Sequence, residues 1–113
     1  MKKGTIVLTE FPFTDLSSIK RRPAVVVSTL DPASQDVIVA FISSVLTGNT
    51  SHFDYILSDT HPDFKASGLK KSSVFKMDKL ATLDKSIFSG ELGDVSPEIF
   101  EELKKRLRLA LDI

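Results

Sequence analysis

Two short apolar runs constrain the fold of this chain more than any other feature of its sequence. Residues 24–27 are four apolar residues in succession, and residues 37–42 form a second, longer run. Runs of this length that are rich in β-branched residues are typical of central strands buried on both faces. Weaker strand patterns cover residues 4–10, 52–57 and 72–83, and the last of these is long enough to bend and to supply two strands.

The chain ends in a different pattern, which predicts one amphipathic helix. Ser96 is a good N-cap, Pro97 suits the first helical position, and the helix dipole favours the carboxylate of Glu98. One face of this helix carries the apolar residues Ile99, Phe100, Leu103, Leu107, Ala110 and Leu111. Leu109 falls outside that stripe, so we expect it to be exposed.

Five or six short strands and one helix predict a mainly β (α+β) fold, built as a small, strongly curved sheet or barrel. Pro12 has no N–H to donate and should end the first strand, and residues 14–20 and 59–68 are expected to be loops. The length of 113 residues predicts a single domain over residues 1–113.

Composition excludes several classes of protein. There is no cysteine, so the chain has no disulfide scaffold and no thiolate chemistry. No apolar run approaches a membrane span and the N-terminus has no secretory pattern, so we expect a cytoplasmic protein without a membrane partner. Lys+Arg and Asp+Glu both number 15, which excludes an overall basic coat but leaves local basic patches open.

Arg22 and Ser43 are the first candidates for chemistry. Pro23 should hold Arg22 extended at the start of a buried strand, where a guanidinium fork can hold a phosphate. The alternative is an ordinary solvated arginine. Ser43 ends the second apolar run, where a hydroxyl can be functional or can simply cap a turn.

The most basic part of the chain is residues 65–85, with six lysines against two aspartates. A polyanion can bind such a stretch. Lys76 and Asp78 are two apart on a predicted strand and should project to the same side, either for phosphate chemistry or as a surface pair. The two histidines lack the spacing of a metal site, and the isolated glycines form no phosphate loop, so neither metal nor cofactor is predicted.

Four stretches together resemble one known family. Residues 4–7, 22–27, 37–44 and 68–85 are similar, in order and spacing, to the MazF/PemK (Kid) toxin endoribonucleases of toxin–antitoxin modules. The resemblance implies an SH3-like β-barrel and a homodimer with an RNA groove across its interface. It also implies metal-independent cleavage of single-stranded RNA through the 2′-OH, growth inhibition, a cognate antitoxin, and DNA binding only together with that antitoxin.

The resemblance also implies roles for particular residues. Arg22 and Ser43 correspond to catalytic positions, and Lys76-Met77-Asp78 stands where one branch of the family has Arg-x-Asp. Residues 14–21 lack the histidine of that branch, which favours the pair of Arg22 and Ser43. The side chains expected to bind RNA are Lys20, Arg21, Phe13, Lys70, Lys71, Lys76 and Asp78.

Two alternatives remain open at this point. One is a non-catalytic binder on the same fold, either a gyrase poison or a DNA-binding co-repressor that acts with its antitoxin. The other is an SH3-type adaptor, which the single tyrosine and the lack of tryptophan disfavour.

Overall fold

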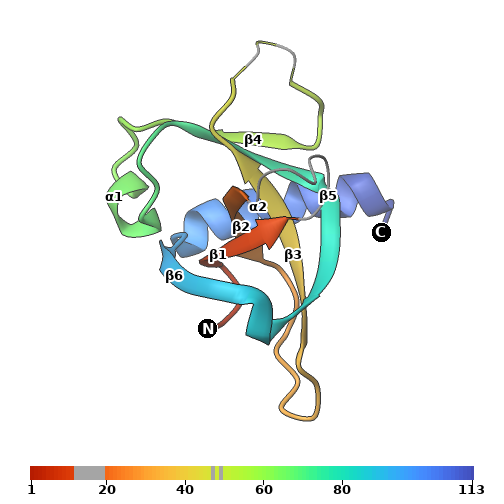
Figure 1. Cartoon of the computed structure of the whole chain (residues 1–113). Coiled ribbons are helices and arrows are strands. Elements are labelled where there is room, and N and C mark those ends of the chain that lie inside the picture. Colours follow the sequence, from red (N-terminus) through yellow and green to blue (C-terminus); the bar gives the residue numbers. More distant parts are fainter. Residues whose placement is uncertain (12–19, 47, 49) are drawn as a thin grey trace.

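The computed structural model describes residues 1–11, 20–46, 48 and 50–113, which form one antiparallel sheet and two α-helices (Figure 1). The strand order is β4-β5-β3-β2-β1-β6. The elements are β1 (Thr5–Phe11), β2 (Lys20–Val26), β3 (Asp36–Ser43), β4 (Asp54–Leu57), α1 (Phe64–Ser67), β5 (Ser73–Asp84), the 3₁₀ turn η1 (Lys85–Ile87), β6 (Phe88–Asp94) and α2 (Pro97–Leu111).

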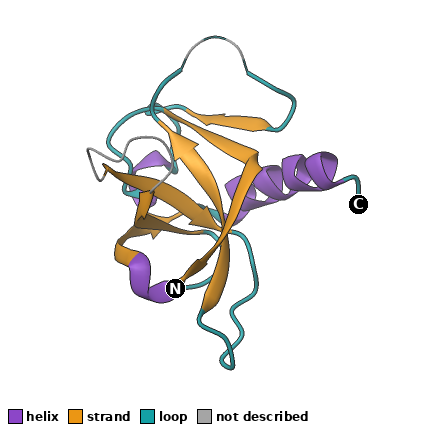
Figure 2. Cartoon of the chain, turned by 45° about the vertical axis from the view of Figure 1, so that its right-hand side comes forward, coloured by secondary structure: helices purple, strands orange, loops and turns teal. Residues whose placement is uncertain are grey.

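The sheet is strongly curved, and β5 is the strand that bends it. Ala40 of β3 pairs with Leu80, but the next residue, Phe41, pairs with Lys76, so residues 77–79 are extra on the β5 side. Irregular pairing of this kind bends a strand and increases its twist. The mainly β class with a C-terminal helix is confirmed, as a curved sheet with β4 and β6 at its edges rather than a closed barrel (Figure 2).

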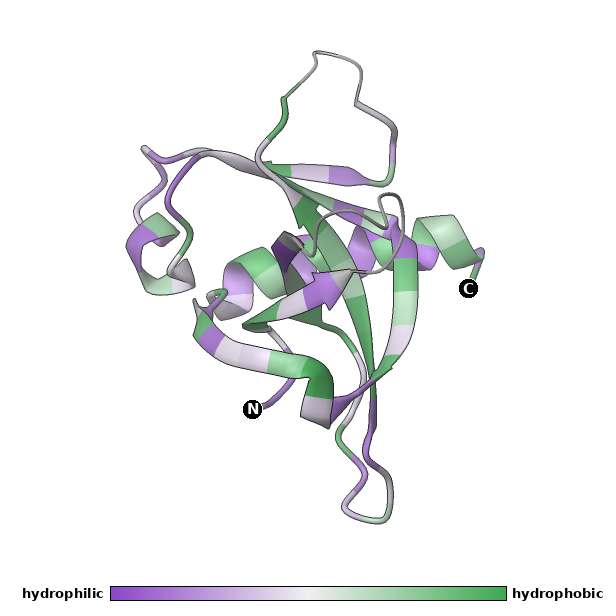
Figure 3. Cartoon of the chain, in the orientation of Figure 1, coloured by the Kyte–Doolittle hydropathy of each residue, from purple (hydrophilic) through white to green (hydrophobic). Residues whose placement is uncertain are grey.

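The central strands are buried on both faces, as the apolar runs predict. On one face Val25 and Ile42 pack in the same cluster as Ile99 and Leu103 of α2. On the other face Val7, Ala24, Val26, Val37 and Val39 form a second cluster, closed by Leu83 and Phe88 where the sheet curls over. In the hydropathy colouring of Figure 3, β3 is green along most of its length.

Helix α2 begins where the sequence predicts. The Oγ of Ser96 accepts a hydrogen bond from the Ile99 backbone N–H at 3.2 Å, and Pro97 is the first helical residue. Leu109 is exposed, as expected, but Leu111 is 49% exposed although it was expected on the buried stripe. The reason is that the C-terminal end of α2 projects beyond the sheet (Figure 2).

A second anchor fixes α2 against β4. Arg106 donates from Nε to the carbonyl oxygen of Asp54 at 2.9 Å, and its guanidinium lies 4.9 Å from the ring centroid of Tyr55. Burial raises the pKa of Tyr55, and the positive charge of Arg106 partly opposes this. The helix is therefore held at its middle by polar contacts as well as by its apolar face.

Three features differ from the sequence-based expectation. Strand β6 was not among the expected strands; it contains Gly90 and Gly93, but an exposed edge strand needs few packing side chains. Residues 59–68 were expected to be loop and contain the single turn α1. Pro23 lies inside β2 rather than before it, and the ladder with β3 starts at Ala24, so no β3 hydrogen bond is lost.

The loop expected at residues 14–20 lies outside the described residues except for Lys20, which opens β2. Within the described part of the chain, no helix is long and apolar enough to cross a membrane.

Candidate functional site

The strand register brings Arg22 and Ser43 to one face of the sheet. Thr9 of β1 pairs directly with Arg22 of β2. The ladder between β2 and β3 ends at the pair of Ala24 and Phe41, and Arg22 and Ser43 each lie two residues beyond that pair on their own strand, on the same face. Opposed residues of antiparallel strands project to the same face. Thr9, Arg22 and Ser43 therefore lie on one face of β1, β2 and β3, and we call this set of three residues the reactive row.

The members of the reactive row differ in exposure. Arg22 is exposed and Ser43 is half-buried. The Oγ of Ser43 accepts a hydrogen bond from the Val45 backbone N–H at 3.1 Å, so this hydroxyl shapes the turn after β3 and keeps its own proton to donate. The arrangement offers a guanidinium fork and a hydroxyl, which is a donor set suited to a phosphodiester.

Thr9 is a member of the row that sequence reasoning missed. Its side chain is completely buried, and among the described residues its Oγ1 is the buried side-chain oxygen or nitrogen that lacks a hydrogen-bond partner. The sequence shows Thr9 only as a β-branched strand residue, and only its pairing with Arg22 reveals the relation.

Lys76 of β5 lies on the same face of the sheet as Ser43. Phe41 pairs with Lys76 and Ser43 pairs with Val74, so both β5 residues share the face of the reactive row. The Lys76 Nζ lies 3.9 Å from Oδ2 of Asp54, whose side chain is only 5% exposed. Lys76 therefore has its carboxylate partner on β4, while Asp78 is exposed within the irregular part of β5.

A cavity of about 370 Å³ lies at the same edge of the sheet, lined by Leu8, Pro23 and Ile42 from the opposite face and also by Arg22 of the reactive row. Four of the predicted basic residues line it, namely Arg21, Arg22, Lys70 and Lys71. They come from β2 and from the segment before β5, so the fold unites two sequence stretches that are about fifty residues apart. Ser44 lines this cavity, whereas Ser43 is not among its lining residues.

Two glycines hold the lysine segment in place beside β6. Gly68 ends α1 with a φ of 75°, the left-handed region that glycine adopts without strain. A Cβ on Gly93 of β6 would overlap the carbonyl oxygen of Ala66, so the two backbones touch. Helix α1 is therefore packed on the end of β6, as Figure 1 shows, and Lys70 and Lys71 follow at once.

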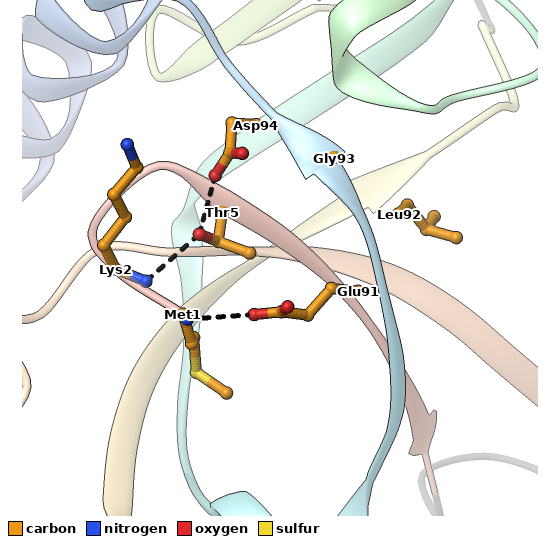
Figure 4. A pocket seen from close by; sticks show the side chains of 7 residues that line it. All are labelled: Met1, Lys2, Thr5, Glu91, Leu92, Gly93 and Asp94. Carbon is orange, nitrogen blue, oxygen red and sulfur yellow. Dashed lines mark hydrogen bonds and ion pairs between the residues drawn. The ribbon is translucent and has the colours of Figure 1, made fainter.

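A second hollow at the start of β1 has a structural explanation. The buried Thr5 hydroxyl donates to Oδ1 of Asp94 at 2.7 Å and accepts from the Lys2 backbone N–H at 3.1 Å (Figure 4). The Met1 amino group lies 3.1 Å from Oε1 of Glu91. These contacts tie the start of β1 to β6, and the side chains are already paired with one another.

The remaining predicted residues can be placed only in part. Phe13 lies outside the described residues, and for Lys20 the structure gives the backbone position opposite Phe11. The Nδ1 of His61 accepts a hydrogen bond from the Asp63 backbone N–H at 2.9 Å, so this histidine stabilises a turn. Across the described ranges, no three His, Asp or Glu side chains are grouped as metal ligands.

Comparison with known proteins identifies the class of protein that carries this fold. The family model of the PemK-like, MazF-like toxins of type II toxin–antitoxin systems matches residues 2–111. The chain therefore belongs to this family. It is 27% identical over 94 residues to the endoribonuclease MazF6 of Mycobacterium tuberculosis, a match that covers 83% of this chain and 81% of the relative.

Solved structures agree on the fold. An endoribonuclease in complex with its cognate antitoxin, from a mycobacterial species, superposes with a TM-score of 0.76 at 17% identity, covering 100% of this chain and 96% of the other. A MazE–MazF structure from Deinococcus radiodurans gives a TM-score of 0.77 at 20% identity, covering 100% and 96%.

Proposed function

We propose that this chain is the toxin of a toxin–antitoxin pair and acts as a sequence-specific endoribonuclease on single-stranded RNA. The RNA 2′-OH attacks the adjacent phosphorus and loses its proton to water, the bond to the 5′ oxygen of the next nucleotide breaks, and that oxygen takes up a proton from water. The products are a 2′,3′-cyclic phosphate and a free 5′-OH. Because the nucleophile belongs to the substrate, the proposed reaction needs no metal ion and no cofactor.

The reactive row is the observation that carries this proposal. Negative charge builds on the phosphorane-like transition state, and preorganised donors aimed at that charge lower its free energy. Arg22 offers a fork of N–H donors at an exposed strand position, and Ser43 offers a hydroxyl proton on the same face. We assign charge stabilisation to Arg22 and orientation of a non-bridging oxygen to Ser43.

Binding of the substrate falls to the surrounding basic residues. Lys76 and Asp54 lie on the face of the reactive row, and Lys76 can contact the phosphate of a neighbouring nucleotide. Asp78, exposed on β5, is proposed to position that nucleotide, and Lys20 and Phe13 remain proposed contacts from the segment before and at the start of β2. Affinity that depends on such charges falls with salt.

The family supplies the expected partners. One solved neighbour is an endoribonuclease in complex with its cognate antitoxin, and we propose a cognate antitoxin for this chain, with DNA bound only through that antitoxin. We also propose a single domain, a homodimer and a cytoplasmic site of action, where mRNA is available to the enzyme.

The test is incubation of the purified chain with a long single-stranded RNA in excess chelator, followed by mapping of the new 5′ ends. We expect cleavage at a short recurring sequence, with 5′-OH ends that a kinase can label without prior phosphatase. An oligonucleotide with one 2′-deoxy sugar at the cleaved position should resist cleavage, because the nucleophile is missing.

Two outcomes would overturn the proposal. Cleavage of the deoxy oligonucleotide would exclude the 2′-OH mechanism. A pure protein that binds its antitoxin but cuts no RNA would instead favour a non-catalytic toxin that binds a protein target such as a gyrase.

A further inference from the structure

The buried hydroxyl of Thr9 is the group in the reactive row to which the proposed cleavage reaction gives no role. The side chain is completely buried, and within the described part of the chain its Oγ1 is the buried side-chain oxygen or nitrogen that lacks a hydrogen-bond partner. The other buried polar residues among those described all have hydrogen-bonded hydroxyls, namely Thr5, Ser67 and Ser73. The free hydroxyl is therefore a property of this one position.

Thr9 lies between the proposed catalytic arginine and an irregularity in the sheet. On one side Thr9 pairs directly with Arg22 of β2. On the other side it pairs with Phe88 of β6, and the pairing of the preceding residue skips Ser89, which is extra on the β6 side. The Oγ of Ser89 donates to the carbonyl oxygen of Leu8 at 3.3 Å, so the irregularity is held in place. Irregular pairing of this kind re-aims side chains and is frequent next to active sites.

The chemistry of Thr9 and Arg22 suits one hydrogen bond between them. A guanidinium carries five N–H donors and no acceptor, and a hydroxyl oxygen has two lone pairs that can accept. The Cβ atoms of directly opposed strand residues are about 4.5–5.5 Å apart, so a long side chain that folds back reaches its partner. Arg22 is exposed, and none of the ion pairs among the described residues involves it. Its guanidinium is therefore free to make this contact.

We propose that Thr9 is a positioning residue for Arg22: when a phosphodiester binds, the Thr9 Oγ1 accepts one guanidinium N–H and the remaining donors of the fork turn towards the phosphate. The inference rests on the proposed function, because Thr9 acts through the catalytic role of Arg22. A bound phosphate displaces water from the guanidinium, and a donor that loses water needs another acceptor. The contact fixes the direction of the donors where charge builds on the phosphorus, so it acts on kcat rather than on KM.

The test compares Thr9→Val with Thr9→Ser, with cleavage rates measured over a range of RNA concentrations and urea unfolding measured on the same preparations. Thr9→Val keeps the shape and removes the acceptor, so kcat should fall about 10-fold with KM within twofold, while the protein becomes more stable. Thr9→Ser keeps the acceptor and removes a buried methyl group, so kcat should stay within twofold of the parent, while the protein becomes less stable. A purely structural role of Thr9 cannot produce these opposite movements of rate and stability.

The dependence on Arg22 is tested in a double variant. In the Arg22→Ala background, Thr9→Val should cause no further loss of kcat beyond twofold, because the donors that the hydroxyl positions are gone. Thr82→Val is the matched control, since Thr82 is an exposed threonine of β5 outside the reactive row. This control should cleave as the parent protein does.

The outcomes separate this inference from the proposed function. If the parent protein cleaves RNA and Thr9→Val has the parental kcat, or if the losses in Thr9→Val and Arg22→Ala multiply as independent effects, Thr9 does not position Arg22 and the cleavage reaction stands. If Thr9→Ser loses as much of kcat as Thr9→Val, the hydroxyl is not the acting group and the inference is wrong. If the parent protein cleaves no RNA, the proposed function fails and this inference fails with it.

Discussion

At the scale of single residues, the row of Thr9, Arg22 and Ser43 contains both the proposed chemistry and an energetic cost. A buried hydroxyl without a hydrogen-bond partner costs about 1–3 kcal/mol of stability. Among the described residues, Thr9 carries such an unpartnered buried hydroxyl, and Thr9 pairs with Arg22 in the sheet. Functional sites often keep such costs, since groups arranged for a ligand are not arranged for stability alone.

Replacing Thr9 by valine, which has the same shape without the hydroxyl, should therefore stabilise the protein. We expect Thr9→Val to raise the free energy of unfolding by about 1 kcal/mol, measured by urea denaturation. Thr5→Val is the matched control, because the Thr5 hydroxyl is also buried but makes hydrogen bonds to Asp94 and Lys2. That control should lower stability. A loss of stability in Thr9→Val would show that the hydroxyl is satisfied in solution.

Ser43 and Ser44 are adjacent hydroxyls with different expected roles. Ser43→Ala should lower the single-turnover cleavage rate by about 10-fold, because Ser43 lies in the reactive row. Ser44→Ala, at a residue that lines the cavity on the opposite face, should leave that rate nearly unchanged. Equal losses in the two variants would remove the distinction between the faces.

At the scale of elements, the contact between α1 and β6 decides where Lys70 and Lys71 lie. A methyl group on Gly93 would meet the backbone of Ala66 and Ser67, which cannot rotate away as a side chain can. We expect Gly93→Ala to lower the free energy of unfolding by about 1–3 kcal/mol, measured by thermal or urea denaturation. Gly90→Ala is the control, since no atom lies within 4 Å of the added methyl group. Equal stability of the two variants would contradict the close contact.

The elements also show how far the sequence predicts this structure. The apolar runs in β2 and β3 and the capped start of α2 are encoded locally, so periodicity and capping residues identify them. Strand β6 was missed because its residues are mostly exposed and include two glycines, and its pairing with β1 depends on a partner some eighty residues away. Helix α1 is a single turn, too short for any periodic signal.

The candidate site, too, is encoded locally in part and depends on distant pairing for the rest. Arg22, Lys70 and Lys71 stand out in the sequence by residue type, and their gathering at one cavity follows from the fold. Which face each residue takes was not predictable locally, since it depends on register. The partner of Lys76 shows this, because its carboxylate comes from Asp54 on a neighbouring strand and not from Asp78 on its own.

At the scale of the whole molecule, the proposed homodimer would need an apolar surface, and the C-terminal end of α2 offers one. Leu109, Leu111 and Ile113 are 57%, 49% and 84% exposed, beyond the edge of the sheet. We expect sedimentation at micromolar concentration to give twice the monomer mass of 12.5 kDa. Leu109→Asp should shift this equilibrium towards the monomer, because it places a charge in an apolar contact. A parent protein that sediments only as a monomer would exclude the homodimer.

The central claim is that Arg22 stabilises the charge of an RNA-cleaving transition state, and its most direct test is the single-turnover rate of Arg22→Ala. Loss of one donor of this kind lowers rates by about 10²–10³-fold, and Arg22→Lys should recover little, because an ammonium group lacks the two-pronged geometry. Both variants should unfold as the parent does, because Arg22 is exposed. We predict that Arg22→Ala lowers the single-turnover cleavage rate by about 10²–10³-fold and leaves the unfolding midpoint unchanged. Cleavage by Arg22→Ala at the parental rate would contradict the account.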